Sequence, residues 1–178
     1  MKQSLPVWQT VGFLFTGIAG VLLHFLFDWS GGSPFVAPFS AVNESIWEHM
    51  KLLFFPMFLF ALLQSWFIGK DYESFWCVKL IGILTGVILI PVLYYTINGI
   101  FGTTPDRVNI IIFFITDAIV YLLETRLLSK DSVRCIFPRL GVLLLCFLAL
   151  LFIVLTFYPP VLPLFLDPLS RTYGYFMN

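Results

Sequence analysis

The chain has 178 residues, of which 60% are hydrophobic and only 11% are charged, and its mean hydropathy is +0.96. This composition excludes an ordinary soluble globular domain and indicates an integral membrane protein. Ten basic and ten acidic residues give a formal net charge of zero, so the basic surface that nucleic-acid binding requires is not expected.

Five apolar segments are long enough to cross a bilayer, since a helical crossing takes about 20 apolar residues. In chain order, we expect helices over residues 7–28, 43–69, 75–100, 107–129 and 136–158. Pro56 lies inside the second segment and is expected to kink it, because proline removes one backbone hydrogen bond. The sequence therefore predicts an all-α fold in which residues 1–178 form a single domain of five transmembrane helices.

The basic residues predict how these helices are oriented. A cytoplasmic N-terminus puts most of them on the cytoplasmic side, namely Lys2, Lys70, Lys79, Arg126, Lys130, Arg134 and Arg139. Only Lys51, Arg107 and Arg171 fall on the other side, which is the bias of the positive-inside rule. We therefore expect a multi-pass protein of the cell membrane with a cytoplasmic N-terminus and an extracytoplasmic C-terminus.

The cysteines are scattered along the chain without a CxxC spacing. They are Cys77, Cys135 and Cys146. This arrangement argues against a zinc finger and against a disulfide framework. We expect the three side chains to be small apolar fillers of helix interfaces.

The densest polar segment is the nonapeptide from Asn43 to Lys51, which holds two carboxylates, an imidazole and an ammonium group. Asn43 can cap the second helix at this point, and Ser45-Ile46-Trp47-Glu48 fits a capping box. On a helix, Glu44, Glu48 and Lys51 would share one stripe, because residues three and four apart lie on the same face. His49 would lie about 100° away from Glu48. An ordinary charged helix start is the alternative interpretation.

The expected topology brings polar residues of separate helices to the extracytoplasmic leaflet. Both histidines of the chain, His24 and His49, fall at that depth. Two imidazoles with a carboxylate are a ligand set typical of zinc, iron and manganese. We therefore predict a divalent metal such as zinc, with His24, Glu48 and His49 as its ligands. Hydrogen-bonded packing of the histidines is the alternative.

Further polar residues at the same depth are predicted to bind a ligand. They are Glu44, Lys51, Tyr95 and Asn98. For the tyrosine, an aromatic belt at the membrane interface is the alternative.

Asp117 lies about ten residues into the fourth expected helix, which is about 15 Å below its start. A carboxylate at that depth is costly and usually faces the bundle interior. We predict that Asp117 and Glu48 are catalytic residues and that a polar cavity runs from His24 and Glu48 toward Asp117. The alternative is a protonated Asp117 hydrogen-bonded to a neighbouring helix.

Several short motifs carry a family resemblance. They are the nonapeptide Asn43 to Lys51, the preceding Ala41-Val42, Leu23-His24-Phe25, Trp29-Ser30-Gly31, Leu164-Phe165-Leu166-Asp167-Pro168 and Tyr173-Gly174. With these motifs the chain resembles a family of small bacterial membrane proteins known as domain of unknown function 6512. The resemblance implies a polytopic membrane protein and brings no activity with it. Arg171 departs from the family pattern, which has a glycine at that place.

Three functions remain open on the residues alone. The first is a membrane-embedded hydrolase or transferase that acts on a lipid-like substrate. The second is an ion- or proton-coupled transporter or binding protein of a small molecule, which would require a homo-oligomer because five helices cannot form an even inverted repeat. The third is a structural or accessory membrane subunit. The lipid bilayer is an expected partner in all three.

Overall fold

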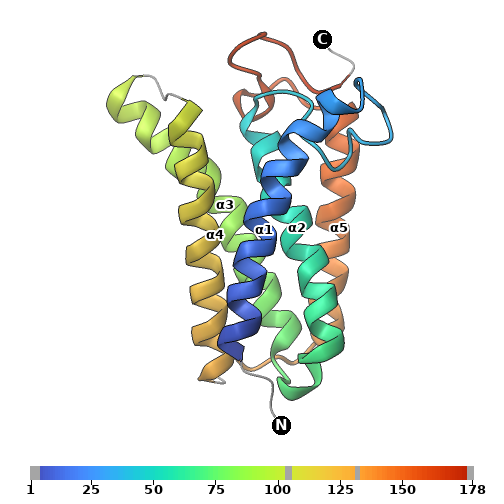
Figure 1. Ribbon diagram of the computed structural model, residues 1–178, viewed down its shortest axis with the longest axis vertical. Coiled ribbons are helices and arrows are strands. Elements are labelled where there is room, and N and C mark those ends of the chain that lie inside the picture. Colours follow the sequence, from blue (N-terminus) through green and yellow to red (C-terminus); the bar gives the residue numbers. More distant parts are fainter. Residues whose placement is uncertain (1–4, 103–105, 131–132, 176–178) are drawn as a thin grey trace.

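A computed structural model describes residues 5–102, 106–130 and 133–175 (Figure 1). Its helices are α1 (Leu5–Trp29), α2 (Ile46–Phe67), α3 (Phe75–Phe101), α4 (Asp106–Ser129) and α5 (Pro138–Phe157), with short 3-10 helices η1 (Gly69–Asp71) and η2 (Pro163–Phe165). Five of them are long and apolar enough to cross a membrane, and the described residues contain no strand. The predicted all-α membrane fold is confirmed.

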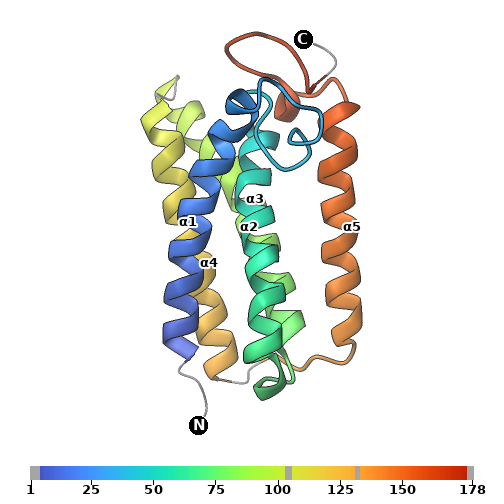
Figure 2. The ribbon, with the colours of Figure 1, turned by 45° about the vertical axis from the view of Figure 1, so that its right-hand side comes forward.

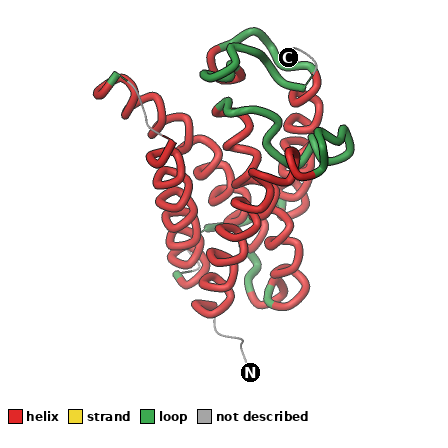
Figure 3. Tube along the Cα trace, turned by 45° about the horizontal axis from the view of Figure 1, so that its top comes forward, coloured by secondary structure: helices red, strands yellow, loops and turns green. Residues whose placement is uncertain are grey.

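The first four helices form the bundle in which the polar residues meet. α1 packs against α2 and α4, and α3 packs against the same two helices. α5 stands at the side and contacts α3 and α2 (Figure 2). Two long loops, residues 30–45 and 158–175, lie at the end of the bundle opposite Leu5 (Figures 1 and 3). We call this end the loop end.

Close helix contacts depend on glycines at two places that matter for the polar residues. A Cβ at Gly20 of α1 would lie 2.5 Å from Phe113 Cζ and 3.1 Å from the carbonyl oxygen of Leu52. Within α2, the carbonyl of Leu52 would normally accept from the N–H of residue 56, but Pro56 has no N–H to donate. A Cβ at Gly82 of α3 would lie 2.6 Å from a carboxylate oxygen of Glu124. The small residues therefore let α1 and α3 approach α2 and α4 closely.

Of the two caps that the sequence offers at the start of α2, the structure uses Ser45 of the capping box and not Asn43. The helix begins at Ile46 with Ser45 as its N-cap, and Ser45 Oγ accepts a hydrogen bond from the N–H of Glu48. Asn43 Oδ1 instead accepts from the N–H of Ser45 at 3.0 Å. Because these two local bonds place the cap at Ser45, Glu44 lies outside the helix. The predicted stripe of Glu44, Glu48 and Lys51 on one helix face is wrong.

The cysteine prediction is wrong as well. Cys77 at the start of α3 and Cys135 before α5 form a disulfide with a Cα–Cα distance of 5.8 Å, although they are 58 residues apart in sequence. Cys146 is free and exposed on α5 rather than buried in a helix interface. Spacing rules recognise cysteines that lie close in sequence, whereas this pair is brought together by the packing of α5 on α3.

The C-terminal segment folds over the loop end. The N–H of Tyr175 donates to the carbonyl of Thr156 at 2.8 Å, and Leu166 and Tyr173 form an antiparallel bridge. Arg171 lies between the bridged residues Leu166 and Tyr173 and has a φ of 62°, in the left-handed region that glycine adopts most easily. This backbone conformation gives a physical reason for a glycine at the position where the resembled family has one.

Candidate metal site at the loop end

Three side chains from different parts of the chain converge at the loop end. His24 comes from the last turns of α1, Glu44 from the loop before α2, and His49 from the first turn of α2. One ligand atom from each lies within 4.8 Å of the other two. The His24 Nε2 atom is 3.6 Å from Glu44 Oε1, and the His49 Nε2 atom is 3.5 Å from Glu44 Oε2. The structure therefore brings both predicted histidines together with Glu44.

Local hydrogen bonding fixes the direction of the His49 ring. Its Nδ1 atom lies 2.9 Å from the carbonyl oxygen of Ser45. A carbonyl can only accept, so Nδ1 carries the hydrogen and donates it. In a neutral ring, Nε2 then presents a lone pair toward the carboxylate of Glu44. Two acceptors that face each other are stabilised by a group between them, which can be a proton on the imidazole, a bridging water or a metal ion.

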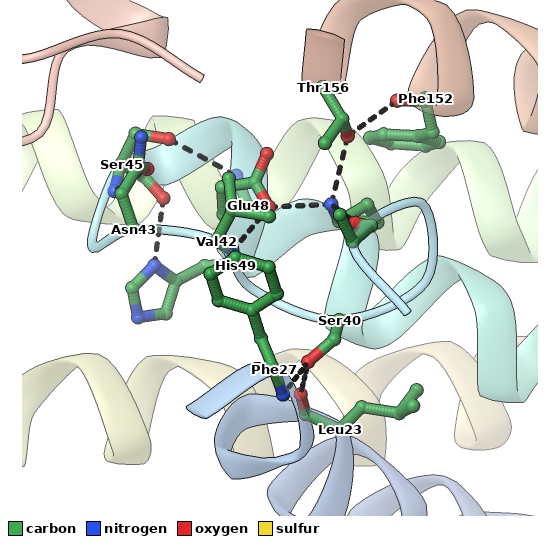
Figure 4. Close-up of polar contacts among 12 residues, drawn as sticks. Leu23, Phe27, Ser40, Val42, Asn43, Ser45, Glu48, His49, Phe152 and Thr156 are labelled. Atoms are coloured by element: carbon green, nitrogen blue, oxygen red, sulfur yellow. Dashed lines mark hydrogen bonds and ion pairs between the residues drawn. The ribbon is translucent and has the colours of Figure 1, made fainter. Parts of the chain in front are cut away.

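Glu48 does not join this group. Its carboxylate is 2.5 Å from the ammonium of Lys51, and the two side chains are 1% and 0% exposed. Figure 4 shows Glu48 on the side of Thr156, with the imidazole of His49 directed away from it. Neighbouring helix positions point about 100° apart, which explains why Glu48 and His49 have different partners. The predictions of Glu48 as a metal ligand and catalytic residue remain untested.

The Glu48–Lys51 pair connects three parts of the loop end. Lys51 Nζ donates to the carbonyl of Ala37 at 2.8 Å and to Thr156 Oγ1 at 2.9 Å. Glu48 Oε2 also accepts from the N–H of Val42 at 3.0 Å. An ammonium group has three donors, and here all three have acceptors. This arrangement ties the loop and α5 to α2, and the predicted ligand-binding role of Lys51 remains untested.

A cavity of about 160 Å³ lies beside the three convergent side chains, between α1 and α4. Its lining is mostly apolar and consists of Gly20, Val21, His24, Phe25, Glu44, His49, Leu52, Asn109, Ile110, Phe113 and Phe114. The predicted cavity was expected to be polar and to include Glu48 and Asp117, but neither residue lines this one. Phe113 lies one helical turn from Asp117 on the same side of α4 and forms part of the cavity wall.

Asn109 of α4 is a cavity residue that sequence reasoning missed. It borders both the main cavity and a small hollow of about 10 Å³ that also touches His49 and Tyr94. Its Oδ1 atom is buried and has no hydrogen-bond partner among the described residues. The sequence could have indicated this residue, because it places an amide side chain near the start of the fourth apolar segment, at the depth of the histidines.

Asp117 lies deeper in the bundle and is fully buried. Neither of its oxygens has a hydrogen-bond partner within the described part of the chain. One turn further, Tyr121 Oη lies 3.0 Å from Thr16 Oγ1, and Glu124 pairs with Lys79 at 2.5 Å. The face of α4 that carries Asp117, Tyr121 and Glu124 is thus buried against the bundle, and the proposed catalytic role of Asp117 remains untested.

The two predicted ligand-binding residues of α3 lie away from the cavity lining. Tyr95 is 43% exposed and packs edge-on against Tyr94, which is the tyrosine that borders the small hollow. Asn98 is half-buried near the end of α3. Their roles in binding remain predictions.

Comparisons with curated proteins and with solved structures found no match. A family match covers residues 1–175. This range includes the whole membrane bundle and all three convergent side chains. The chain belongs to the family of unknown function DUF6512.

Proposed function

We propose that the chain binds a divalent metal ion such as zinc through His24, Glu44 and His49, and that it is a metal-dependent hydrolase of the membrane. The observation that carries the proposal is the convergence of two imidazole nitrogens and a carboxylate oxygen within 4.8 Å. Two histidines and a glutamate are a ligand set of catalytic zinc, which leaves the fourth position for water or substrate. In this proposal Glu44 takes the place that the sequence suggested for Glu48.

The surroundings of the three ligands favour hydrolysis of a lipid-like substrate. A zinc ion with an open position lowers the pKa of its bound water to about 7 and supplies a nucleophile. The Ser45 carbonyl holds the ring of His49 so that Nε2 faces the ligand group, which is how protein groups outside the ligand set usually orient a metal-binding histidine. The adjoining cavity is lined mainly by apolar residues. These features suit an apolar substrate better than a polar one.

The metal content of the purified protein tests this proposal. In detergent, the wild-type chain should retain about one zinc ion per molecule after dialysis, and Glu44→Gln, His24→Ala and His49→Ala should each lose it. Glu73→Gln changes an exposed glutamate at the other end of the bundle and is the matched control. Normal zinc content in all three site variants would refute the proposed ligand set.

We also propose that the N-terminus is cytoplasmic, so that the metal ligands face the extracytoplasmic leaflet. The basic residues support this orientation, because most of them then lie on the cytoplasmic side, as the positive-inside rule expects. It places Cys77 and Cys135 on the cytoplasmic side, where disulfides are rare, so the pair would be present as thiols in cells. Labelling of intact cells with a membrane-impermeant maleimide, after introduction of a cysteine at Ser170, should succeed. If a cysteine introduced at Lys130 is labelled and one introduced at Ser170 is not, the orientation is reversed.

A second candidate function, an ion- or proton-coupled binding protein, rests on Asp117. Its carboxyl group is fully buried and has no hydrogen-bond partner among the described residues, and such buried carboxyl groups are common in the ion and proton pathways of membrane proteins. Liposomes that contain the protein should then dissipate a pH gradient, and Asp117→Asn should abolish the flux while Glu44→Gln preserves it. Equal leakage of liposomes with and without the protein would exclude this function.

A further inference from the structure

We infer that the cavity between α1 and α4 takes a single-chain ester lipid whose head group carries a hydroxyl, and that this lipid enters sideways from the bilayer. The inference builds on the proposed metal site and names the substrate class. It rests on where the cavity opens, how large it is and which polar atoms lie at its end.

The cavity opens on the apolar surface of the bundle. Four of its lining residues are also exposed on that surface, with Val21 at 42%, Phe25 at 44%, Ile110 at 57% and Phe114 at 38%. All four lie in α1 and α4, within stretches that are long and apolar enough to cross a membrane. Acyl chains of the bilayer contact such a surface, so a hydrocarbon chain can pass into the cavity without crossing water.

The volume of the cavity limits what it can hold. At about 160 Å³, it is close to an engineered apolar cavity of about 150 Å³ that binds benzene. Pockets for larger organic ligands start at about 300 Å³. The space therefore accommodates part of one hydrocarbon chain, whereas two chains side by side would not fit.

The polar end of the cavity selects the head group. On one side stand His24, Glu44 and His49, where a carbonyl oxygen of an ester could approach a bound metal ion. On the other side stands Asn109, whose buried Oδ1 lacks a donor among the described residues. A hydroxyl on the alcohol part of the ester would supply that donor. Hydrolysis would then break the acyl C–O bond, with the water oxygen joining the acyl carbon and a proton passing to the released alcohol.

A pair of neighbouring positions on α4 offers a sharp test of the entry route. Ile110 lines the cavity and is 57% exposed, whereas Ile111 is 55% exposed and does not line it. Ile110→Trp should fill the opening, and Ile111→Trp makes the same change to the adjacent surface. The probe is 1-dodecanoylglycerol with a photoreactive diazirine near the end of its chain, added to the protein in lipid nanodiscs. Mass spectrometry measures covalent label per chain.

We expect Ile110→Trp to reduce labelling at least tenfold and Ile111→Trp to leave it at the wild-type level. Both variants should keep the wild-type zinc content, which also shows that they fold. If Ile110→Trp is unstable, Val21→Trp replaces it, with Ile18→Trp as control because Ile18 is 63% exposed and outside the cavity lining. Equal labelling of the cavity variant and its control would overturn the inference.

The role of Asn109 has its own readout. Asn109→Leu should lower labelling by the hydroxyl-bearing probe about fivefold, since one hydrogen bond is lost. Labelling by a dodecyl acetate probe, which has no hydroxyl, should not change. An equal effect on both probes would refute the hydroxyl selection. A protein that lacks zinc but retains the contrast between Ile110→Trp and Ile111→Trp would refute the metal proposal and leave the lipid entry route standing.

Discussion

Breaking the buried ion pair of Glu48 and Lys51 should lower the stability of the protein more than any other single polar substitution at the loop end. Glu48→Gln keeps the size of the side chain and an oxygen for the N–H of Val42, but it removes the counter-charge of an ammonium that is 0% exposed. Breaking a buried pair in this way costs about 3–5 kcal/mol, because a charge remains without compensation. For a chain of this size, that corresponds to a fall in Tm of about 6–20 °C.

Glu44→Gln provides the comparison, because Glu44 is 38% exposed and its ion pairs are with histidines. Exposed pairs contribute about 0.2–1 kcal/mol, or less than about 4 °C in Tm. Tryptophan fluorescence during heating in detergent, with the metal removed by a chelator, measures both variants. Equal Tm values for Glu48→Gln and Glu44→Gln would refute the expectation that the buried ammonium of Lys51 depends on the charge of Glu48.

The double variant Glu48→Gln, Lys51→Met separates a lost contact from an unpaired charge. Removing both charges should recover most of the stability that Glu48→Gln loses, since the desolvated ammonium is gone. A double variant that is less stable than Glu48→Gln alone would show that the hydrogen bonds of Lys51 to Ala37 and Thr156 matter more than its charge.

Three further predictions concern the backbone and the disulfide. Gly141→Ala should destabilise the protein by about 1–3 kcal/mol, because the new Cβ would lie 2.8 Å from the carbonyl oxygen of Trp76. A Cβ at Gly99 would meet no atom of the described residues within 4 Å apart from its chain neighbours and the backbone of its own helix, so Gly99→Ala should stabilise the protein by about 0.5–1 kcal/mol. A higher Tm for Gly141→Ala than for Gly99→Ala would contradict this. Arg171→Gly should raise stability by roughly 1 kcal/mol, since φ is 62° there; a lower Tm would contradict it. In oxidised protein, Cys77→Ser should lower the free energy of unfolding by about 2–5 kcal/mol, whereas Cys146→Ser should leave it unchanged. Under reducing conditions, Cys77→Ser and the wild type should have the same Tm.

The helices could be predicted from the sequence because each crossing is a long apolar run with polar ends. The error at the start of α2 arose where a few local hydrogen bonds decide the geometry. Asn43 and Ser45 can both cap a helix, and the selection of Ser45 exchanges the roles of Glu44 and Glu48. A pattern of helical spacing cannot detect such an exchange.

The candidate site could be predicted in part, because the order of the helices fixes the depth of a residue in the membrane but not the direction of its side chain. His24 and His49 could be assigned to one depth from the topology alone, and the structure brings them together. The Cys77–Cys135 contact and the position of Asn109 depend on which helices are neighbours and how they are rotated. Apolar helices that carry hydrophobic residues on all sides give little information on rotation.

X-ray absorption at the zinc edge of the zinc-loaded protein tests the central claim most directly. The account predicts two imidazole nitrogens at about 2.0–2.1 Å and one carboxylate oxygen at about 2.0–2.2 Å from the metal. Any zinc that His49→Ala takes up only in the presence of excess metal should have one imidazole ligand fewer. A zinc spectrum without imidazole ligands, or one that is identical in the wild type and His49→Ala, would contradict a metal site formed by His24, Glu44 and His49.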